Sequence, residues 1–188
     1  MATELPRVLP DTNVCYPISL LDLMLRCDEH DLHRVVWTDD LLDELVRVWI
    51  RNGARSKRSA TAIVRQIAET FPDQHVGRDD YQHLIPTMPG ADPDDHVHAA
   101  AAASIAPSII LTANTKDFPA MHLAALGVTV VHPDAYFHEL LDAVPDEIHA
   151  VLAEMSKSRR RPPTSVLEVV GALERAGLQA FAQRFRGE

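Results

Sequence analysis

A helix followed by a buried strand is predicted by residues 92–112, which read DPDDHVHAAAAASIAPSIILT. Asp92 can cap the helix, Pro93 suits its first position, and acidic side chains in the first turn complement the helix dipole. Pro107 ends the helical pattern. The run at 108–112 is apolar and rich in β-branched residues, which is typical of a parallel strand that is buried on both faces. This unit therefore predicts a helix packed on a parallel β-sheet.

On either side of this unit, further strands alternate with helices, and this order predicts an α/β fold with right-handed crossovers. The expected strands lie at 7–9, 35–37 and 127–131, and the expected helices at 18–26, 39–51, 56–70 and 120–126. Residues 72–90 have the composition of a loop with one short strand. After residue 132 only helices are expected, at 135–141, 146–155 and 165–184. We therefore predict two domains, residues 1–144 and a helical extension over 145–188.

The composition is that of a globular protein, with 188 residues, 46% hydrophobic and 24% charged. No window holds 18 apolar residues, which argues against a membrane-spanning segment, and the N-terminus lacks the apolar run of a signal peptide. Two cysteines, Cys15 and Cys27, without zinc-ligand spacing are expected to be buried free thiols. The expected location is therefore the cytoplasm.

The net charge of -9 is unevenly distributed. Residues 151–188 carry +3 and the rest of the chain -12. Residues 45–68 nevertheless contain six cationic residues and no acidic one. Such a basic segment can bind a phosphate backbone, although it can equally be a solvated helix face. The residues expected to bind phosphate are Arg47, Arg51 and Arg55 from this segment, together with Lys116.

Several carboxylates map to the carboxyl ends of the predicted strands, where open parallel sheets bind ligands. Asp11 follows the first strand, Asp95 opens the helix that leads into the strand at 108–112, and Asp117 follows that strand. Helical periodicity places Glu44 at the margin of an apolar face, beside Arg47. Converging carboxylates repel one another unless a cation holds them, and all-oxygen ligands favour Mg²⁺ or Mn²⁺. Metal-assisted phosphodiester hydrolysis fits this set.

Each of these residues also has an ordinary structural explanation. Asp11 can be a turn residue, Asp95 a helix-dipole partner, Asp117 an Asx-turn, and Glu44 the ion-pair partner of Arg47. The His30/His33 and His96/His98 pairs have metal-like spacing without a third ligand, so zinc is not favoured. Trp37 and Trp49 are expected in the core rather than as base-stacking surfaces.

Four sequence blocks resemble, in order and spacing, the PIN-domain ribonucleases. The resemblance covers roughly residues 6–141, and the helical tail is similar to that of VapC toxins with a C-terminal extension. It implies a three-layer PIN-like fold, with a central parallel β-sheet flanked by helices. The four blocks are DTNV at 11–14, WTDDLLDE at 37–44, DPDDHVHAAA at 92–101 and LTANTKDFP at 111–119.

The resemblance implies a Mg²⁺-dependent endoribonuclease, with Mn²⁺ as a substitute, whose acidic residues are Asp11, Glu44 and Asp95. Many members have Asp where this chain has Asn114, so either Asn114 or Asp117 completes the metal site. Because Asn114 carries no formal charge and would weaken a second metal site, we expect one bound metal, with a two-metal site as the open alternative. The groups expected to orient ligands or water by their position are Thr12, Asn13, Thr38 and Thr112.

The resemblance also implies partners: a DNA-binding antitoxin, an RNA substrate and a second copy of the chain in a homodimer. Transfer RNA is the first expectation for the substrate and ribosomal RNA the second. One alternative is a haloacid dehalogenase-type phosphatase, but that chemistry needs a second Asp where Asn13 stands. Another alternative is an inactive PIN-like module that only binds RNA or protein, which the neutral amide of Asn114 would allow.

Overall fold

The centre of the molecule is a parallel β-sheet. The computed structural model describes residues 4–90, 92–158 and 163–187. Within these residues the sheet has four strands in the order β2-β1-β3-β4. Pro10 pairs with Leu111 at the end of the two central strands, so the chain leaves both at the same edge. The strands are β1 (Arg7–Pro10), β2 (Arg34–Val35), β3 (Ser108–Leu111) and β4 (Val128–Val131).

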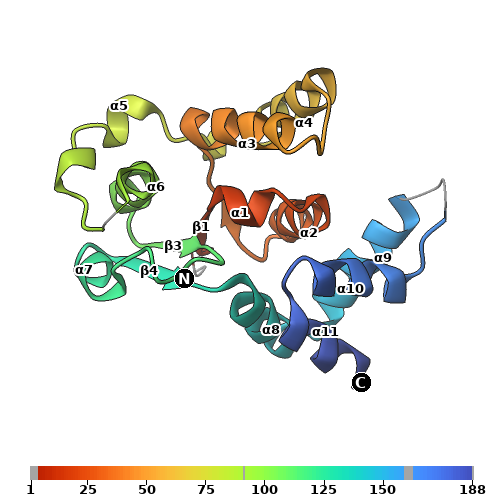
Figure 1. Cartoon of the computed structure of the whole chain (residues 1–188). Helices are drawn as coiled ribbons and strands as arrows, with labels where there is room; N and C mark the ends of the chain where they lie inside the picture. Colours follow the sequence, from red (N-terminus) through yellow and green to blue (C-terminus); the bar gives the residue numbers. More distant parts are fainter. Residues whose placement is uncertain (1–3, 91, 159–162, 188) are drawn as a thin grey trace.

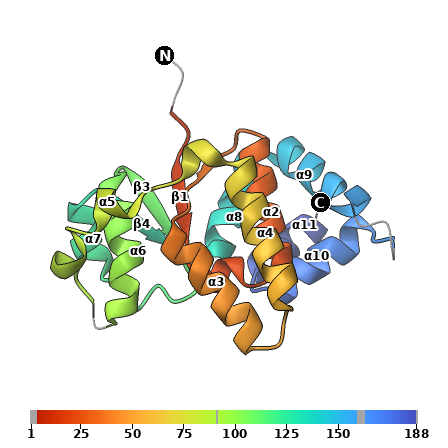
Figure 2. The ribbon, with the colours of Figure 1, turned by 90° about the horizontal axis from the view of Figure 1, so that it is seen from above.

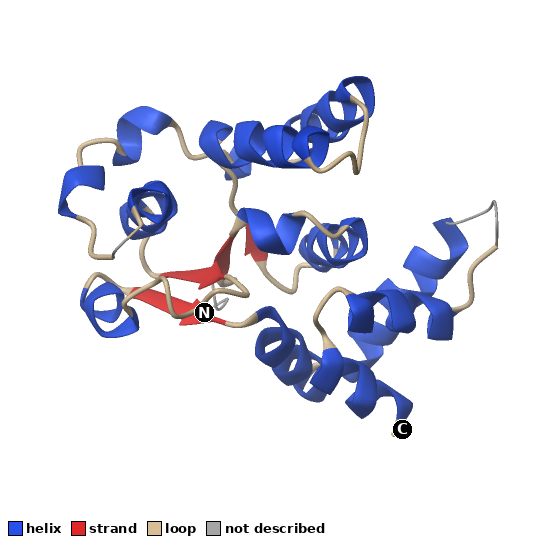
Figure 3. Ribbon diagram, viewed as in Figure 1, coloured by secondary structure: helices blue, strands red, loops and turns tan. Residues whose placement is uncertain are grey.

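Helices cover both faces of this sheet (Figures 1 and 3). Side chains alternate along the strands, so Val8 and Leu111 face one core cluster while Leu9 and Ile110 face another. The helices up to β4 are α1 (Thr12–Cys15), α2 (Ile18–Glu29), α3 (Asp39–Arg51), α4 (Lys57–Thr70), α5 (Arg78–Tyr81), α6 (Pro93–Ser104) and α7 (Ala120–Ala125), with 3-10 turns η1 (Pro72–Gln74) and η2 (Ile85–Thr87).

Local signals set the two helices that matter most for the site. The Thr38 hydroxyl accepts a hydrogen bond from the Leu41 N–H at 3.1 Å and so starts α3 as predicted. Asp92 likewise accepts from the Asp94 N–H at 3.0 Å at the start of α6. Both helices therefore begin where capping rules place them.

The C-terminal helices are α8 (Pro133–Ala143), α9 (Pro145–Ser158), α10 (Val166–Arg175) and α11 (Gln179–Arg186). The last three lie on one side of the molecule in both views, and α8 packs against α9 and α11 (Figures 1 and 2). They share a continuous core cluster with α2 and with one face of the sheet. The Asp134 carboxylate on α8 accepts the N–H groups of Ala180 at 2.9 Å and Phe181 at 3.0 Å. These bonds fasten the start of α11 to α8. The division of the chain at residue 144 stays a prediction.

Three details of the prediction were wrong. The single helix at 165–184 is two helices, because Gly177 adopts a left-handed φ of 108° that ends α10. The loop at 72–90 contains η1, α5 and η2. The second strand ends at Val35, and Trp37 makes only an isolated bridge to His75. α10 begins with a capping box, in which the Ser165 N–H donates to Glu168 Oε2 at 2.7 Å.

The predictions for the cysteines and the tryptophans can be checked directly. Cys15 and Cys27 are both buried and unpaired, as expected. Trp37 and Trp49 are buried, which confirms that they belong to the core. None of the described helices has the length and apolar character needed to cross a membrane.

Candidate functional site

Asp11 is held rigidly at the edge where β1 and β3 end. Its backbone N–H donates to the Leu111 carbonyl at 2.9 Å, and the residue is 8% exposed. Thr112 donates its hydroxyl to Asp11 Oδ2 at 2.7 Å, and the Asn13 amide donates to the same oxygen. No hydrogen bond from the described residues reaches Oδ1. Asp11 is therefore oriented through one oxygen, and the other is left for a ligand.

The same two neighbours position the loop after β3. Asn13 Oδ1 accepts the Ala113 N–H at 3.0 Å, and Thr112 Oγ1 accepts the Asn114 N–H at 3.0 Å. Two of the side chains predicted to orient the site, Asn13 and Thr112, thus contact Asp11 directly. Thr38 instead caps α3, and Thr12 lies buried in the wall of the adjacent cavity.

A cavity of about 420 Å³ is lined by three of the four predicted carboxylates. Asp11 from the end of β1, Glu44 from α3 and Asp95 from α6 all line it, and so does Asn114. Asp117 is exposed and is not part of the lining, although its charge acts on Asp95. We call this space the carboxylate cavity, and its other lining residues are Thr12, Asn13, Tyr16, Val48, Asn52, Asp92 and Asp94.

Negative charge in this cavity is only partly compensated. Burial and the charges of Asp11, Asp92 and Asp117 raise the pKa of Asp95 to about 6. Burial, together with Asp11 and Glu44, also raises the pKa of the Cys15 thiol, so this cysteine stays protonated at neutral pH. The cavity thus favours a bound cation and offers no thiolate nucleophile.

Glu44 has a partner that the sequence prediction missed. His98 Nε2 on α6 lies 3.2 Å from Glu44 Oε2, and this hydrogen bond lowers the pKa of Glu44 against the effect of burial. Burial opposes the protonation of His98, but the bond to Glu44 and the charges of Asp11, Glu44 and Asp95 outweigh it and raise the pKa of His98. The spacing in the sequence shows only that His98 lies one turn after Asp95 on the same helix, and it does not report the bond to Glu44.

A second cavity, of about 700 Å³, adjoins the first and shares Glu44, Val48 and Asp94 with it. We call it the basic cavity, because Arg47 and Arg51 from α3 and Arg78 from α5 line it. Its remaining lining residues are Asp40, Ile50, Val97 and His98.

Of the four cations predicted to bind phosphate, Arg47 and Arg51 lie in the basic cavity. The Arg55 guanidinium sits 5.5 Å from the centre of the Trp49 ring, and Lys116 is exposed; neither lines the two cavities. Arg78, which the prediction missed, is held by an ion pair with Asp40. Its role depends on the contact between α5 and α3, which local sequence does not report.

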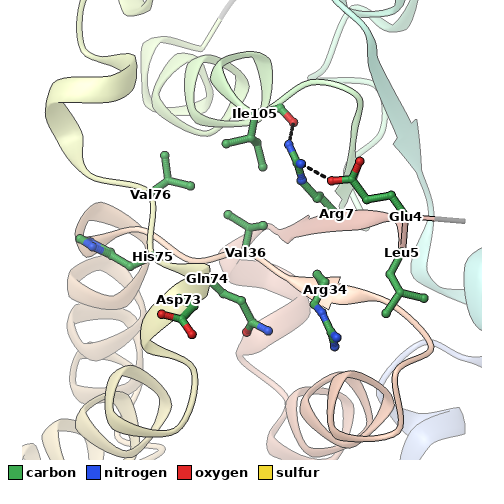
Figure 4. A pocket seen from close by; sticks show the side chains of 10 residues that line it. All are labelled: Glu4, Leu5, Arg7, Arg34, Val36, Asp73, Gln74, His75, Val76 and Ile105. Atoms are coloured by element: carbon green, nitrogen blue, oxygen red, sulfur yellow. Dashed lines mark hydrogen bonds and ion pairs between the residues drawn. The ribbon is translucent and has the colours of Figure 1, made fainter. Parts of the chain in front are cut away.

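A further cavity, of about 740 Å³, opens at the amino ends of β1 and β2, the opposite end of the sheet (Figure 4). Its arginines already have partners in the chain. Arg7 donates to the Ile105 carbonyl at 3.1 Å and pairs with Glu4, whereas Arg34 pairs with Asp31 at 2.6 Å. With its cations engaged and no converging carboxylates, this cavity is not the candidate site.

The donor chemistry of the carboxylate cavity fits a divalent cation. Asp11, Glu44 and Asp95 offer carboxylate oxygens, and the pKa of Asp95 is raised by burial and by neighbouring negative charge that a cation would neutralise. Among the described residues, no three His, Cys, Asp or Glu side chains are already gathered in a metal-binding cluster. The residues thus fit such an ion by chemistry and charge, without a preassembled site.

Comparison with known proteins places this geometry in a family. A family model described as a PIN domain matches residues 7–116, which is more than half of the chain and includes Asp11, Glu44, Asp95 and Asn114. A model described as the VapC50 C-terminal domain matches residues 133–187, the region of α8–α11. A search of curated proteins found no match. The two matches are consistent with a VapC-type toxin with a C-terminal extension, and the chain belongs to the PIN domain family.

Proposed function

We propose that this protein is a divalent-metal-dependent endoribonuclease, and that it is the toxin of a toxin-antitoxin pair. The observation that carries the proposal is the carboxylate cavity, which Asp11, Glu44 and Asp95 line together at the carboxyl edge of the parallel sheet. The PIN domain match supports it, because PIN domains are generally nucleases.

The proposed reaction is hydrolysis of a phosphodiester bond. A water oxygen bonds to phosphorus, the bond from phosphorus to one sugar oxygen breaks, and that oxygen takes up a proton. A bound Mg²⁺ or Mn²⁺ would supply Lewis-acid chemistry, lowering the pKa of the water and stabilising charge on a phosphoryl oxygen. Asp11, Glu44 and Asp95 would hold the ion, with Asn114 or Asp117 completing its site.

The chain's own hydrogen bonds prepare the residues for this role. Thr112 and Asn13 fix one oxygen of Asp11, so that Oδ1 is the oxygen available to a ligand. His98 fixes Glu44 through one carboxylate oxygen. Such preorganisation lowers the cost of assembling the site when the ligand binds.

The basic cavity supports RNA as the substrate. Arg47 and Arg51 adjoin the carboxylates directly, so a phosphodiester in the carboxylate cavity can have its neighbouring phosphates at these guanidinium groups. We further propose structured RNA, with transfer RNA first and ribosomal RNA second, on the strength of the resemblance to VapC toxins. Arg55 and Lys116, outside both cavities, would contact more distant phosphates.

The match to the VapC50 C-terminal domain supports a cognate antitoxin as partner. We propose that this antitoxin neutralises the enzyme, that the toxin forms a homodimer, and that it acts in the cytoplasm. One observation favours a second candidate, a PIN-like module that binds RNA or protein without cutting it. Asn114, an amide, stands in the carboxylate cavity where many PIN domains have Asp.

The test is cleavage of total RNA by purified protein with Mg²⁺, Mn²⁺ or EDTA, followed by mapping of new 5′ ends. Discrete cuts are expected with either metal and not with EDTA. They should be lost in Asp95→Asn and Glu44→Gln and kept in the control Asp43→Asn, an exposed neighbour of Glu44 that lines neither cavity. RNA that stays intact with Mn²⁺ but binds the protein would favour the binding module.

A further inference from the structure

Tyr16 is an aromatic side chain in the wall of the carboxylate cavity. It follows α1 directly, five residues after Asp11, and it is half-buried. Among the described residues that line the carboxylate cavity or the basic cavity, it is the only Phe, Tyr or Trp. An aromatic ring beside the carboxylates is thus a single, well-defined feature of this site.

The rest of Tyr16 is fixed by the core. Tyr16 packs against the cluster that contains Leu45 and Trp49, and it also lines the cavity. The indole N–H of Trp49 donates to the Tyr16 carbonyl at 2.9 Å, and the Tyr16 N–H donates to the Thr12 carbonyl at 2.9 Å. A half-buried side chain that packs against the core has little conformational entropy left to lose when a ligand stacks on it.

The neighbouring charges indicate what would stack there. The cavity beside Tyr16 is acidic, so an anionic ring is disfavoured, and a cationic or neutral flat group is favoured. The adjoining basic cavity at the same time offers Arg47 and Arg51 to phosphates. Neutral flat rings joined by phosphates are nucleotides of an RNA strand.

We infer that Tyr16 is the base-stacking residue of this site and that it orients the nucleotide next to the scissile phosphate. This inference rests on the proposed function. Aromatic stacking is tolerant of sequence because every base has a π-face, so Tyr16 would set the position of the strand more than the identity of the base. No hydrogen bond from its hydroxyl to a described residue is seen, which leaves the ring as the part that acts.

The experiment compares the wild type with Tyr16→Phe, which keeps the ring, and Tyr16→Leu, which keeps an apolar group without the ring. The probes are a fluorescein-labelled short oligoadenylate and an abasic ribose-phosphate strand of equal length. Binding is measured by fluorescence anisotropy in EDTA, which prevents cleavage. Circular dichroism melting checks that each variant is folded, and Tyr16→Met replaces the leucine variant if that one is unfolded.

Loss of the ring is expected to weaken oligoadenylate binding about tenfold, the range of one base stacked on an aromatic side chain. Tyr16→Phe should bind like the wild type, and the abasic strand should bind equally to all variants. Unchanged oligoadenylate binding by Tyr16→Leu, or equal weakening for both probes, overturns the inference. In both of these cases wild-type RNA cleavage would leave the proposed function standing. A wild type that neither binds nor cuts RNA overturns both.

Discussion

Replacing Asp95 with asparagine should make the protein more stable when no divalent cation is present. The pKa of Asp95 rises from its ordinary 3.8 to about 6, because burial and the charges of Asp11, Asp92 and Asp117 disfavour the carboxylate. A rise of this size corresponds to about 3 kcal/mol of unfavourable energy in the ionised state. Asp95 is partly open to solvent, and screening reduces this to about 1 kcal/mol.

The sign follows from linkage. Because the pKa of Asp95 is raised in the folded state, the folded protein binds this proton more tightly than the unfolded chain does. The stability that this proton contributes is complete below pH 3.8, the ordinary pKa, and is lost as the pH rises through about 6. Above pH 7 the wild type therefore carries the full destabilisation, whereas the asparagine variant carries none. Below pH 4 the difference between the two proteins should disappear.

The assay is thermal unfolding in EDTA from pH 4 to pH 8, with Asp94→Asn as the control. Both residues lie in the first turn of α6, so both substitutions remove a favourable interaction with the helix dipole. At pH 7.5 Asp95→Asn should melt about 2–4 °C above Asp94→Asn, the shift that about 1 kcal/mol produces in a chain of this size.

A melting temperature of Asp95→Asn equal to or below that of Asp94→Asn at pH 7.5 would refute this reasoning. It would mean that the carboxylates of the cavity do not repel one another in the folded protein. Titration with Mg²⁺ provides a second check, because a ligand that binds only the folded state raises the melting temperature. Mg²⁺ should stabilise the wild type more than Asp95→Asn.

Three further predictions concern other parts of the molecule. His98→Gln should lower the free energy of unfolding by about 1–2 kcal/mol at pH 6, where protonated His98 bonds to Glu44. This loss should shrink as the pH rises above the ordinary value of 6.5 and through the raised pKa of His98. Urea unfolding at each pH measures it. Arg51→Ala should weaken RNA binding, and the slope of the logarithm of the binding constant against the logarithm of the salt concentration should fall by about one in magnitude. The control Arg65→Ala, outside both cavities, should change both quantities less. Asp134→Ala should cost about 1 kcal/mol of stability in denaturant unfolding, because α11 loses both N–H contacts of its cap; an unchanged midpoint would contradict the fastening of α11 to α8.

The parts of the fold that local chemistry specifies could be predicted from the sequence. Thr38 and Asp92 cap their helices with side chains two or three residues from the groups they bind, so the signal lies within one turn. The break between α10 and α11 was missed because apolar periodicity continues across it. Gly177 was the available signal, since glycine commonly ends a helix in the left-handed region.

The candidate site was predictable to the extent that strand ends and helix periodicity define it. Asp11, Glu44 and Asp95 line one cavity as expected, because parallel strands end at a common edge and α3 presents one face to it. His98 was missed because its place in the site depends on a contact between α6 and α3, which are far apart in sequence. The bond from His98 to Glu44 spans 54 residues, and no local pattern encodes such a distance.

The hydrogen bond from Thr112 to Asp11 joins residues that are 101 positions apart. During translation Asp11 therefore leaves the ribosome long before the residue that orients it has been synthesised. β3, which precedes Thr112 and the loop that holds Asn114, must also emerge and pair with β1. A nascent or prematurely terminated chain that ends before β3 cannot assemble this edge of the sheet. The order of synthesis thus delays completion of the carboxylate cavity until more than half of the polypeptide has been made.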